Sequence, residues 1–239
     1  MTISGKTILV TGANRGIGRA LVEEALDRGA TRVYAGARRP AAHPNARVTA
    51  LRLDVTDARQ IQDAVDHVDS LDILINNAGV AVYDDLKDRA VIEQHLAVNL
   101  LGTHEVTQAF LPLLLRSQGA IVNNLSLNAL APLPVIPAYS MSKAAAFNLT
   151  QSLRALLADR GVRVHAVMTG PVDTEMSRGV DIPKASPESV ARAIFDGVDR
   201  SEADIFPDPM SRSVAQNWHA GAAKELERQY AAVLAQPAQ

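Results

Sequence analysis

The chain has 239 residues, of which 47% are hydrophobic and 21% charged, and its formal net charge is −2. This composition supports a sizeable core, argues against disorder, and gives no electrostatic reason to expect nucleic acid or an anionic membrane as a partner. The lack of cysteine excludes disulfides and thiol catalysis, and no apolar run approaches the roughly 18 residues that cross a bilayer, so we expect a cytoplasmic protein.

Short apolar runs alternate along the chain with longer helical patterns. The runs predict buried strands at 7–12, 32–38, 50–55, 72–79, 120–126 and 162–170, and 203–209 favours a seventh. Helices are predicted at 16–28, 57–68, 88–116 (two helices meeting near 99–102), 138–159, 186–198 and 211–234. This alternation predicts an α/β fold in one domain, 1–239, with a doubly wound, mostly parallel sheet and helices on both faces.

A glycine-rich turn follows the first predicted strand, in the stretch TGANRGIGRAL. Gly12, Gly16 and Gly18 allow a tight turn and let backbone N–H groups approach a pyrophosphate at the start of the next helix. The spacing departs from GxGxxG, and a structural turn without a ligand is the alternative. Its position between a strand and a helix favours the dinucleotide cradle.

The second predicted strand ends in AGARR, without the acidic residue that an NAD site places there. Arg38, together with Arg15 in the glycine turn, can bracket a 2′-phosphate, although arginines are also common at loop ends. We therefore predict NADP(H) as the cofactor. Asp54 and Val55 end the third strand and can meet the adenine, and 76–79 (NNAG) end the fourth, beside the cofactor.

Tyr139 and Lys143 lie one helical turn apart in PAYSMSKAAA. A free tyrosine has a pKa of about 10, and a neighbouring ammonium lowers it towards the range of a proton shuttle. Such a pair alone usually has no function, but Ser126 ends the fifth strand at the same sheet edge and can hold a substrate oxygen. Asn99 interrupts the apolar LAVNLLG, as either a buried helix-kink residue or part of a polar relay.

Five motifs together resemble the short-chain dehydrogenase/reductase family over essentially the whole chain. They are TGxxxGxG at 11–18, NNAG at 76–79, Asn99 in NxxG, Ser126, and YxxxK at 139–143. The resemblance implies a single Rossmann-type domain with a seven-stranded sheet, a cofactor half at about 1–120 and a catalytic and substrate half at about 120–239. It also implies hydride transfer with NADP(H), because in this family basic residues at the positions of Arg15 and Arg38 mark that preference.

The family's roles carry over to matching positions. Tyr139 would protonate the carbonyl oxygen, Ser126 would hold that oxygen, and Lys143 would bind the nicotinamide ribose and lower the pKa of Tyr139. Asn99 would hold a water that links Lys143 to solvent. The implied cofactor-binding residues are Gly12, Asn14, Arg15, Gly16, Ile17, Gly18, Arg38, Asp54, Val55, Asn77, Ala78, Gly79, Tyr139, Lys143, Val172 and Thr174.

The sequence departs from the family pattern at Thr169, where proline is usual, and at Asn124, where an aliphatic residue is usual. The substrate pocket is predicted to involve Ser126, Asn128, Tyr139 and Met176. Its mostly apolar surroundings favour a neutral ketone or aldehyde, unless those side chains only pack the rim. The histidines lack metal-ligand spacing, so no metal is expected.

The leading function is an NADPH-dependent carbonyl reductase or alcohol dehydrogenase acting on a small molecule. The alternatives are a family member that epimerises or dehydrates its substrate, and a catalytically silent NADP(H)-binding sensor or scaffold. Silent members typically lose the tyrosine or the lysine, and this chain retains both. The resemblance further implies a homodimer or homotetramer formed through the helices at 88–116 and 138–159.

Overall fold

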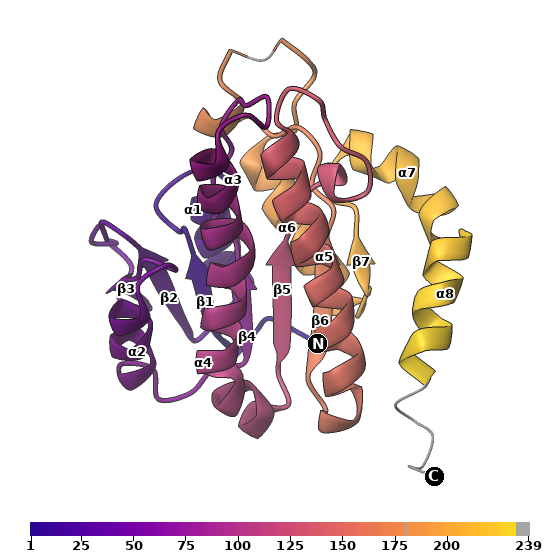
Figure 1. Ribbon diagram of the computed structural model, residues 1–239. Helices are drawn as coiled ribbons and strands as arrows, with labels where there is room; N and C mark the ends of the chain where they lie inside the picture. Colours follow the sequence, from indigo (N-terminus) through magenta and orange to yellow (C-terminus); the bar gives the residue numbers. More distant parts are fainter. Residues whose placement is uncertain (180, 233–239) are drawn as a thin grey trace.

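The computed structural model describes residues 1–179 and 181–232, whose strands form one parallel sheet in the order β3-β2-β1-β4-β5-β6-β7 (Figure 1). The strands are β1 (Thr7–Thr11), β2 (Arg32–Ala37), β3 (Val48–Arg52), β4 (Ile73–Asn76), β5 (Ala120–Asn124), β6 (Arg163–Val167) and β7 (Asp204–Ile205). The predicted doubly wound, seven-stranded sheet is confirmed. Because the strand order reverses between β1 and β4, a crevice opens there at the carboxyl ends of the strands.

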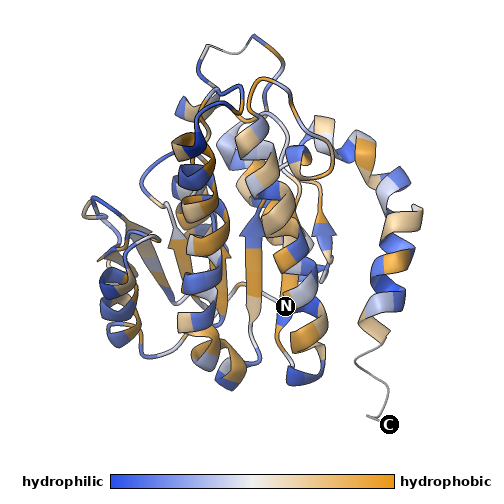
Figure 2. Ribbon diagram, in the orientation of Figure 1, coloured by the Kyte–Doolittle hydropathy of each residue, from blue (hydrophilic) through white to orange (hydrophobic). Residues whose placement is uncertain are grey.

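Helices cover both faces of the sheet, as predicted. Side chains that alternate along each strand divide the core: Ile8 and Val10 pack on one side, and Leu9 packs on the other. The first side is covered by α1 (Gly16–Asp27) and α6 (Pro187–Asp199), and the second by α2 (Ala58–Asp66), α4 (Gly102–Ser117) and α5 (Pro137–Leu157). The central strands therefore bury apolar side chains on both faces, and Figure 2 colours most of β5 as hydrophobic up to its hydrophilic tip.

A π-helical turn joins the two helices that were predicted to meet near 99–102. It spans Ala97–Leu101 and links α3 (Arg89–Leu96) to α4 without a break. The turn buries Asn99. Gly102 follows it where only a glycine fits, because a Cβ there would lie 2.7 Å from a methyl carbon of Val55.

The prediction of one helix at 211–234 is wrong. The segment forms α7 (Pro209–His219) and α8 (Ala222–Ala231), which are separated at 220–221, and positions 233 and 234 lie outside the described residues. Gly221 has extended backbone angles and ends the helical path, so the chain turns before α8. None of the described helices has both the length and the apolarity needed to cross a membrane.

Candidate active site

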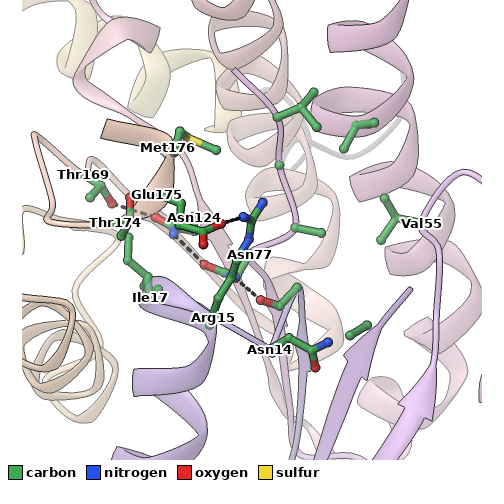
Figure 3. A pocket seen from close by; sticks show the side chains of 18 of the residues that line it. Asn14, Arg15, Ile17, Val55, Asn77, Asn124, Thr169, Thr174, Glu175 and Met176 are labelled. Atoms are coloured by element: carbon green, nitrogen blue, oxygen red, sulfur yellow. Dashed lines mark hydrogen bonds and ion pairs between the residues drawn. The ribbon is translucent and has the colours of Figure 1, made fainter. Parts of the chain in front are cut away.

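A cavity of about 940 Å³ lies at the carboxyl ends of the central strands (Figure 3). Its walls come from the glycine turn, the ends of β2 and β3, the loop after β4, the start of α5 and the segment after β6. This volume is near the upper end of the range of roughly 300–1,000 Å³ for ligand sites. Every residue that was expected to bind the cofactor lines this cavity.

The glycine turn has the geometry of an anion cradle. Gly12 and Gly16 have φ angles of +67° and +52°, which other residues rarely adopt. A Cβ at Gly18 would lie 2.1 Å from the carbonyl oxygen of Gly12, so α1 can begin this close to β1 only with glycine. Arg15, the N-cap of α1, makes no side-chain capping bond, and the first turn holds no acidic residue. The turn therefore fits a pyrophosphate.

Guanidinium groups surround one end of the cavity, where the lining includes Arg15, Arg38, Arg39 and Arg52. β2 ends in Ala37, and no acidic residue stands between it and the arginines. A carboxylate there would repel an additional phosphate, whereas guanidinium groups attract one. Arg15 also forms an ion pair with Glu175, another lining residue (Figure 3).

Ser126, Tyr139 and Lys143 come together in the cavity wall, and all three are buried. Ser126 follows the end of β5, and the other two lie on the first turns of α5. The Lys143 ammonium donates a hydrogen bond of 2.8 Å to the carbonyl oxygen of Asn124 and lies 5.7 Å from the centre of the Tyr139 ring. A hydroxyl, a phenol and an ammonium group therefore border the same space.

Burial dominates the acid–base properties of this pair. It raises the pKa of Tyr139 to about 12, although the Ser126 hydroxyl acts in the opposite direction, and it lowers the pKa of Lys143 to about 8. The expected lowering of the Tyr139 pKa by Lys143 is not found, because desolvation of the phenolate outweighs other effects and the ammonium hydrogen-bonds to Asn124 instead. At neutral pH Tyr139 therefore holds a proton that it can donate.

Asn99 lies behind the wall and does not line the cavity. Its side-chain amide donates bonds of 2.9 Å to the Val80 carbonyl and the Ser142 hydroxyl, and its oxygen accepts a bond of 2.9 Å from the Val80 N–H. A Cβ on Gly79 would lie 3.2 Å from that oxygen and 3.8 Å from the Lys143 ammonium. Asn99 thus joins the loop after β4 to α5 close to Lys143, and its water relay stays a prediction.

The four predicted substrate residues do not all reach the cavity. Ser126, Tyr139 and Met176 line it, and Asn128 does not. The backbone N–H of Asn128 donates a bond of 3.1 Å to the Ser126 hydroxyl, so Asn128 orients Ser126 from the following turn.

His95 was not singled out from the sequence, and Asn124 and Thr169 were named there only as departures from the family pattern. His95 is fully buried against the Tyr139 ring, with ring centres 6.3 Å apart; its Nδ1 donates to the Val91 carbonyl and its Nε2 accepts from the Val82 N–H. Asn124 and Thr169 line the cavity and hydrogen-bond to each other. Polar residues at the ends of buried strands were the available signal for this second pair.

No group of histidine, aspartate and glutamate side chains within residues 1–179 and 181–232 could hold a metal ion. The nicotinamide dinucleotide is thus the group whose chemistry matches the cavity: a cradle for pyrophosphate, cations for a further phosphate, and a proton donor at the other end.

Known proteins share this sequence and fold. A family model described as short chain dehydrogenase matches residues 6–184. An uncharacterized oxidoreductase of Staphylococcus epidermidis is 33% identical over 207 residues, covering 80% of this chain and 90% of the relative. A sorbitol dehydrogenase of Cereibacter sphaeroides is 34% identical over 205 residues and covers 80% of each chain. The crystal structure of a short chain dehydrogenase from Burkholderia cenocepacia in complex with NADP has a TM-score of 0.88 and 35% identity, and covers 96% of this chain and 98% of that one.

Proposed function

Because this chain belongs to the short-chain dehydrogenase family, we propose that it is an oxidoreductase that uses NADPH to reduce a ketone or aldehyde to an alcohol, reversibly. The observation that carries the proposal is the meeting of Ser126, Tyr139 and Lys143 in the wall of one cavity that also contains the glycine turn. A cofactor site and a proton donor thus border the same space.

Different residues of the cavity would bind different parts of the cofactor. The backbone of the glycine turn and the start of α1 would hold the pyrophosphate, Arg15 and Arg38 the 2′-phosphate, and Lys143 the ribose hydroxyls next to the nicotinamide. The NADP complex of the Burkholderia cenocepacia relative supports this choice. When bound, the nicotinamide supplies the hydride, and the protein orients it.

Tyr139 acts as the general acid in the reduction. Its phenol donates a proton to the carbonyl oxygen of the substrate, and the Ser126 hydroxyl hydrogen-bonds to the same oxygen and stabilises the charge that develops there. The raised pKa of Tyr139 suits this direction, because the donor remains protonated at neutral pH. In the reverse direction the tyrosine accepts the proton of the alcohol. Asn99 completes the catalytic set by holding a water next to Lys143.

The substrate that fits this site is a neutral carbonyl compound. The lining arginines come from the glycine turn and the ends of β2 and β3, whereas the lining also contains apolar residues such as Val80, Val98 and Met176. Within residues 1–179 and 181–232, no arginine is placed beside Tyr139 to bind a carboxylate or phosphate of the substrate. That a curated relative is a sorbitol dehydrogenase is consistent with a small, uncharged substrate.

We also expect a cytoplasmic homodimer or homotetramer. Leu101, Met141 and Leu156 are 54%, 48% and 59% exposed on the π-helical turn and α5, and a second copy would cover them. The lack of cysteine suits a reducing compartment.

A panel of ketones, aldehydes and alcohols tests the function. Loss of nicotinamide absorbance with NADPH and a carbonyl substrate is the expected result. The Tyr139→Phe variant should lose turnover and keep its affinity for NADPH, measured by cofactor fluorescence. Binding of NADPH without turnover of any compound would instead favour the silent sensor, and full activity of Tyr139→Phe would reject the acid assigned here.

A further inference from the structure

A row of hydrogen bonds through the side chains of Thr169, Asn124 and Asn77 (Figure 3) crosses the carboxyl ends of the neighbouring strands β6, β5 and β4 and ends on main-chain oxygens after β1. The Thr169 hydroxyl donates a bond of 2.6 Å to the side-chain oxygen of Asn124. The amide nitrogen of Asn124 donates a bond of 2.9 Å to the side-chain oxygen of Asn77. The amide nitrogen of Asn77 donates bonds of 3.0 and 3.3 Å to the carbonyl oxygens of Thr11 and Gly12.

The two carbonyl oxygens at the glycine turn determine which atom donates and which accepts in every bond of the row. The carbonyl oxygens of Thr11 and Gly12 can only accept, so the Asn77 amide nitrogen must face them and its oxygen must face Asn124. Asn124 must then present its nitrogen to Asn77 and its oxygen to Thr169. The Thr169 hydroxyl is therefore the only donor that satisfies the Asn124 oxygen in this row. If that hydroxyl is removed, the side-chain oxygen of Asn124 loses its hydrogen bond in the row, while the side-chain nitrogen keeps its bond to Asn77.

The same residue holds Lys143 through its main chain. The carbonyl oxygen of Asn124 accepts the hydrogen bond of 2.8 Å from the Lys143 ammonium. Asn124 is the last residue of β5, and the peptide group that follows it keeps one bond to β6, in which the Leu125 N–H donates to the Val167 carbonyl oxygen over 2.9 Å. The two side-chain bonds of Asn124 add a second restraint at the end of the strand, beside the carbonyl that accepts from Lys143.

We propose that Asn124 and Thr169 are positioning residues, which hold the Asn124 carbonyl in line with the Lys143 ammonium and tie this contact to the glycine turn through Asn77. The inference rests on the proposed function for its catalytic meaning, since Lys143 is the group that acts beside Tyr139. The hydrogen bonds themselves join protein groups only, so they do not depend on the proposed function.

The chain offers a matched control one residue away. Asn123 also lies on β5, and its side-chain amide donates a bond of 2.9 Å to the hydroxyl of Thr150. Both residues are buried, and neither lines the cavity. Thr150→Val therefore removes an asparagine–threonine bond from the same strand without touching the row, although here the threonine hydroxyl accepts the bond and in the row it donates.

The first test measures the reactivity of Lys143 towards acetic anhydride against pH, by mass spectrometry, in protein without added cofactor. A carbonyl that accepts a bond from the ammonium favours its charged form. Thr169→Val should therefore shift the midpoint to lower pH by roughly half a unit or more. Thr169→Ser keeps the hydroxyl and should restore the wild-type midpoint, and Thr150→Val should leave it unchanged. An unshifted midpoint in Thr169→Val, or an equal shift in Thr150→Val, overturns the proposal.

The second test is the pH profile of turnover. In Thr169→Val the alkaline fall in kcat/KM should move to lower pH by the same amount as the reactivity midpoint, with Thr169→Ser following the wild type. If the alkaline limb of Thr169→Val lies at the same pH as that of the wild type, the row of hydrogen bonds does not affect turnover through Lys143. A wild-type protein that turns over no substrate would reject the proposed function, whereas the reactivity midpoint would still support or overturn the positioning of Lys143.

Discussion

Arg15 in the glycine turn and Glu175 in the segment after β6 form an ion pair, and both residues line the cavity (Figure 3). We place the 2′-phosphate of NADPH at Arg15, so Glu175 competes for that guanidinium group and repels the phosphate. Glu175→Gln should therefore tighten NADPH binding about two- to fivefold, as expected for an exposed pair worth up to about 1 kcal/mol. NADH binding should change less.

Fluorescence titration with both cofactors measures this effect. Glu225→Gln removes the carboxylate of a similarly exposed pair, with Arg228, away from the cavity and serves as the control. Weaker binding of NADPH to Glu175→Gln would mean that the pair organises the site rather than competing with the cofactor.

The charge at Arg38 should decide cofactor preference. Arg38→Asp replaces a phosphate-binding guanidinium by a carboxylate, which repels the phosphate and can accept a bond from a ribose hydroxyl. The ratio of kcat/KM for NADPH to that for NADH should fall at least about tenfold, the loss of one charge-assisted hydrogen bond. Steady-state kinetics with both cofactors provides the measurement. Arg38→Lys should retain most of the preference, and an unchanged ratio in Arg38→Asp would remove the phosphate from this position.

The alkaline limb of the reduction should reflect Lys143. Its pKa is lowered by burial to about 8, whereas burial raises the pKa of Tyr139 to about 12. The kcat/KM of reduction should therefore fall as the pH rises through about 8, because the ammonium loses its charge while the phenol keeps its proton. A profile that stays flat to about pH 10 would show that Lys143 remains charged in the free enzyme.

Asp204 should anchor the C-terminal helices. Burial raises the pKa of this carboxyl, but Arg154, Lys224 and Trp218 outweigh burial and lower it overall; their bonds measure 2.8, 2.6 and 2.7 Å. Asp204→Asn removes the fully buried carboxylate while Glu227 still pairs with Arg154 and Lys224, so the free energy of unfolding at neutral pH should fall by about 2 kcal/mol.

Urea unfolding at several pH values measures this loss. Because the folded pKa of Asp204 is lowered, its contribution is present above the model-peptide value of 3.8 and disappears as the pH falls through the folded pKa, so wild type and variant should converge in acid. Glu202→Gln, in an exposed pair with Arg200, should change stability by less than about 0.5 kcal/mol. Equal losses in the two variants would mean that burial of Asp204 is not the cause.

Much of the architecture was readable from local pattern. Near-continuous apolar runs predicted the strands, and their alternation with helices predicted the doubly wound sheet. Because the carboxyl ends of parallel strands share one edge, the glycine turn, Asn77 and Ser126 were expected to meet, and all line one cavity. The break at 220–221 was missed, since an amphipathic pattern continues across Gly221 and only the backbone angles reveal the turn.

The strands and the identities of the reactive groups follow from the sequence, because local periodicity and short motifs encode both. The chemical behaviour of these groups depends on the three-dimensional fold. Burial, which depends on the whole fold, raises the pKa of Tyr139 and lowers the pKa of Lys143. Thr169 and Asn124, like Arg15 and Glu175, stand far apart in the chain and become partners because the sheet places their segments side by side. No local pattern records which distant residues share a sheet edge or how much water reaches them.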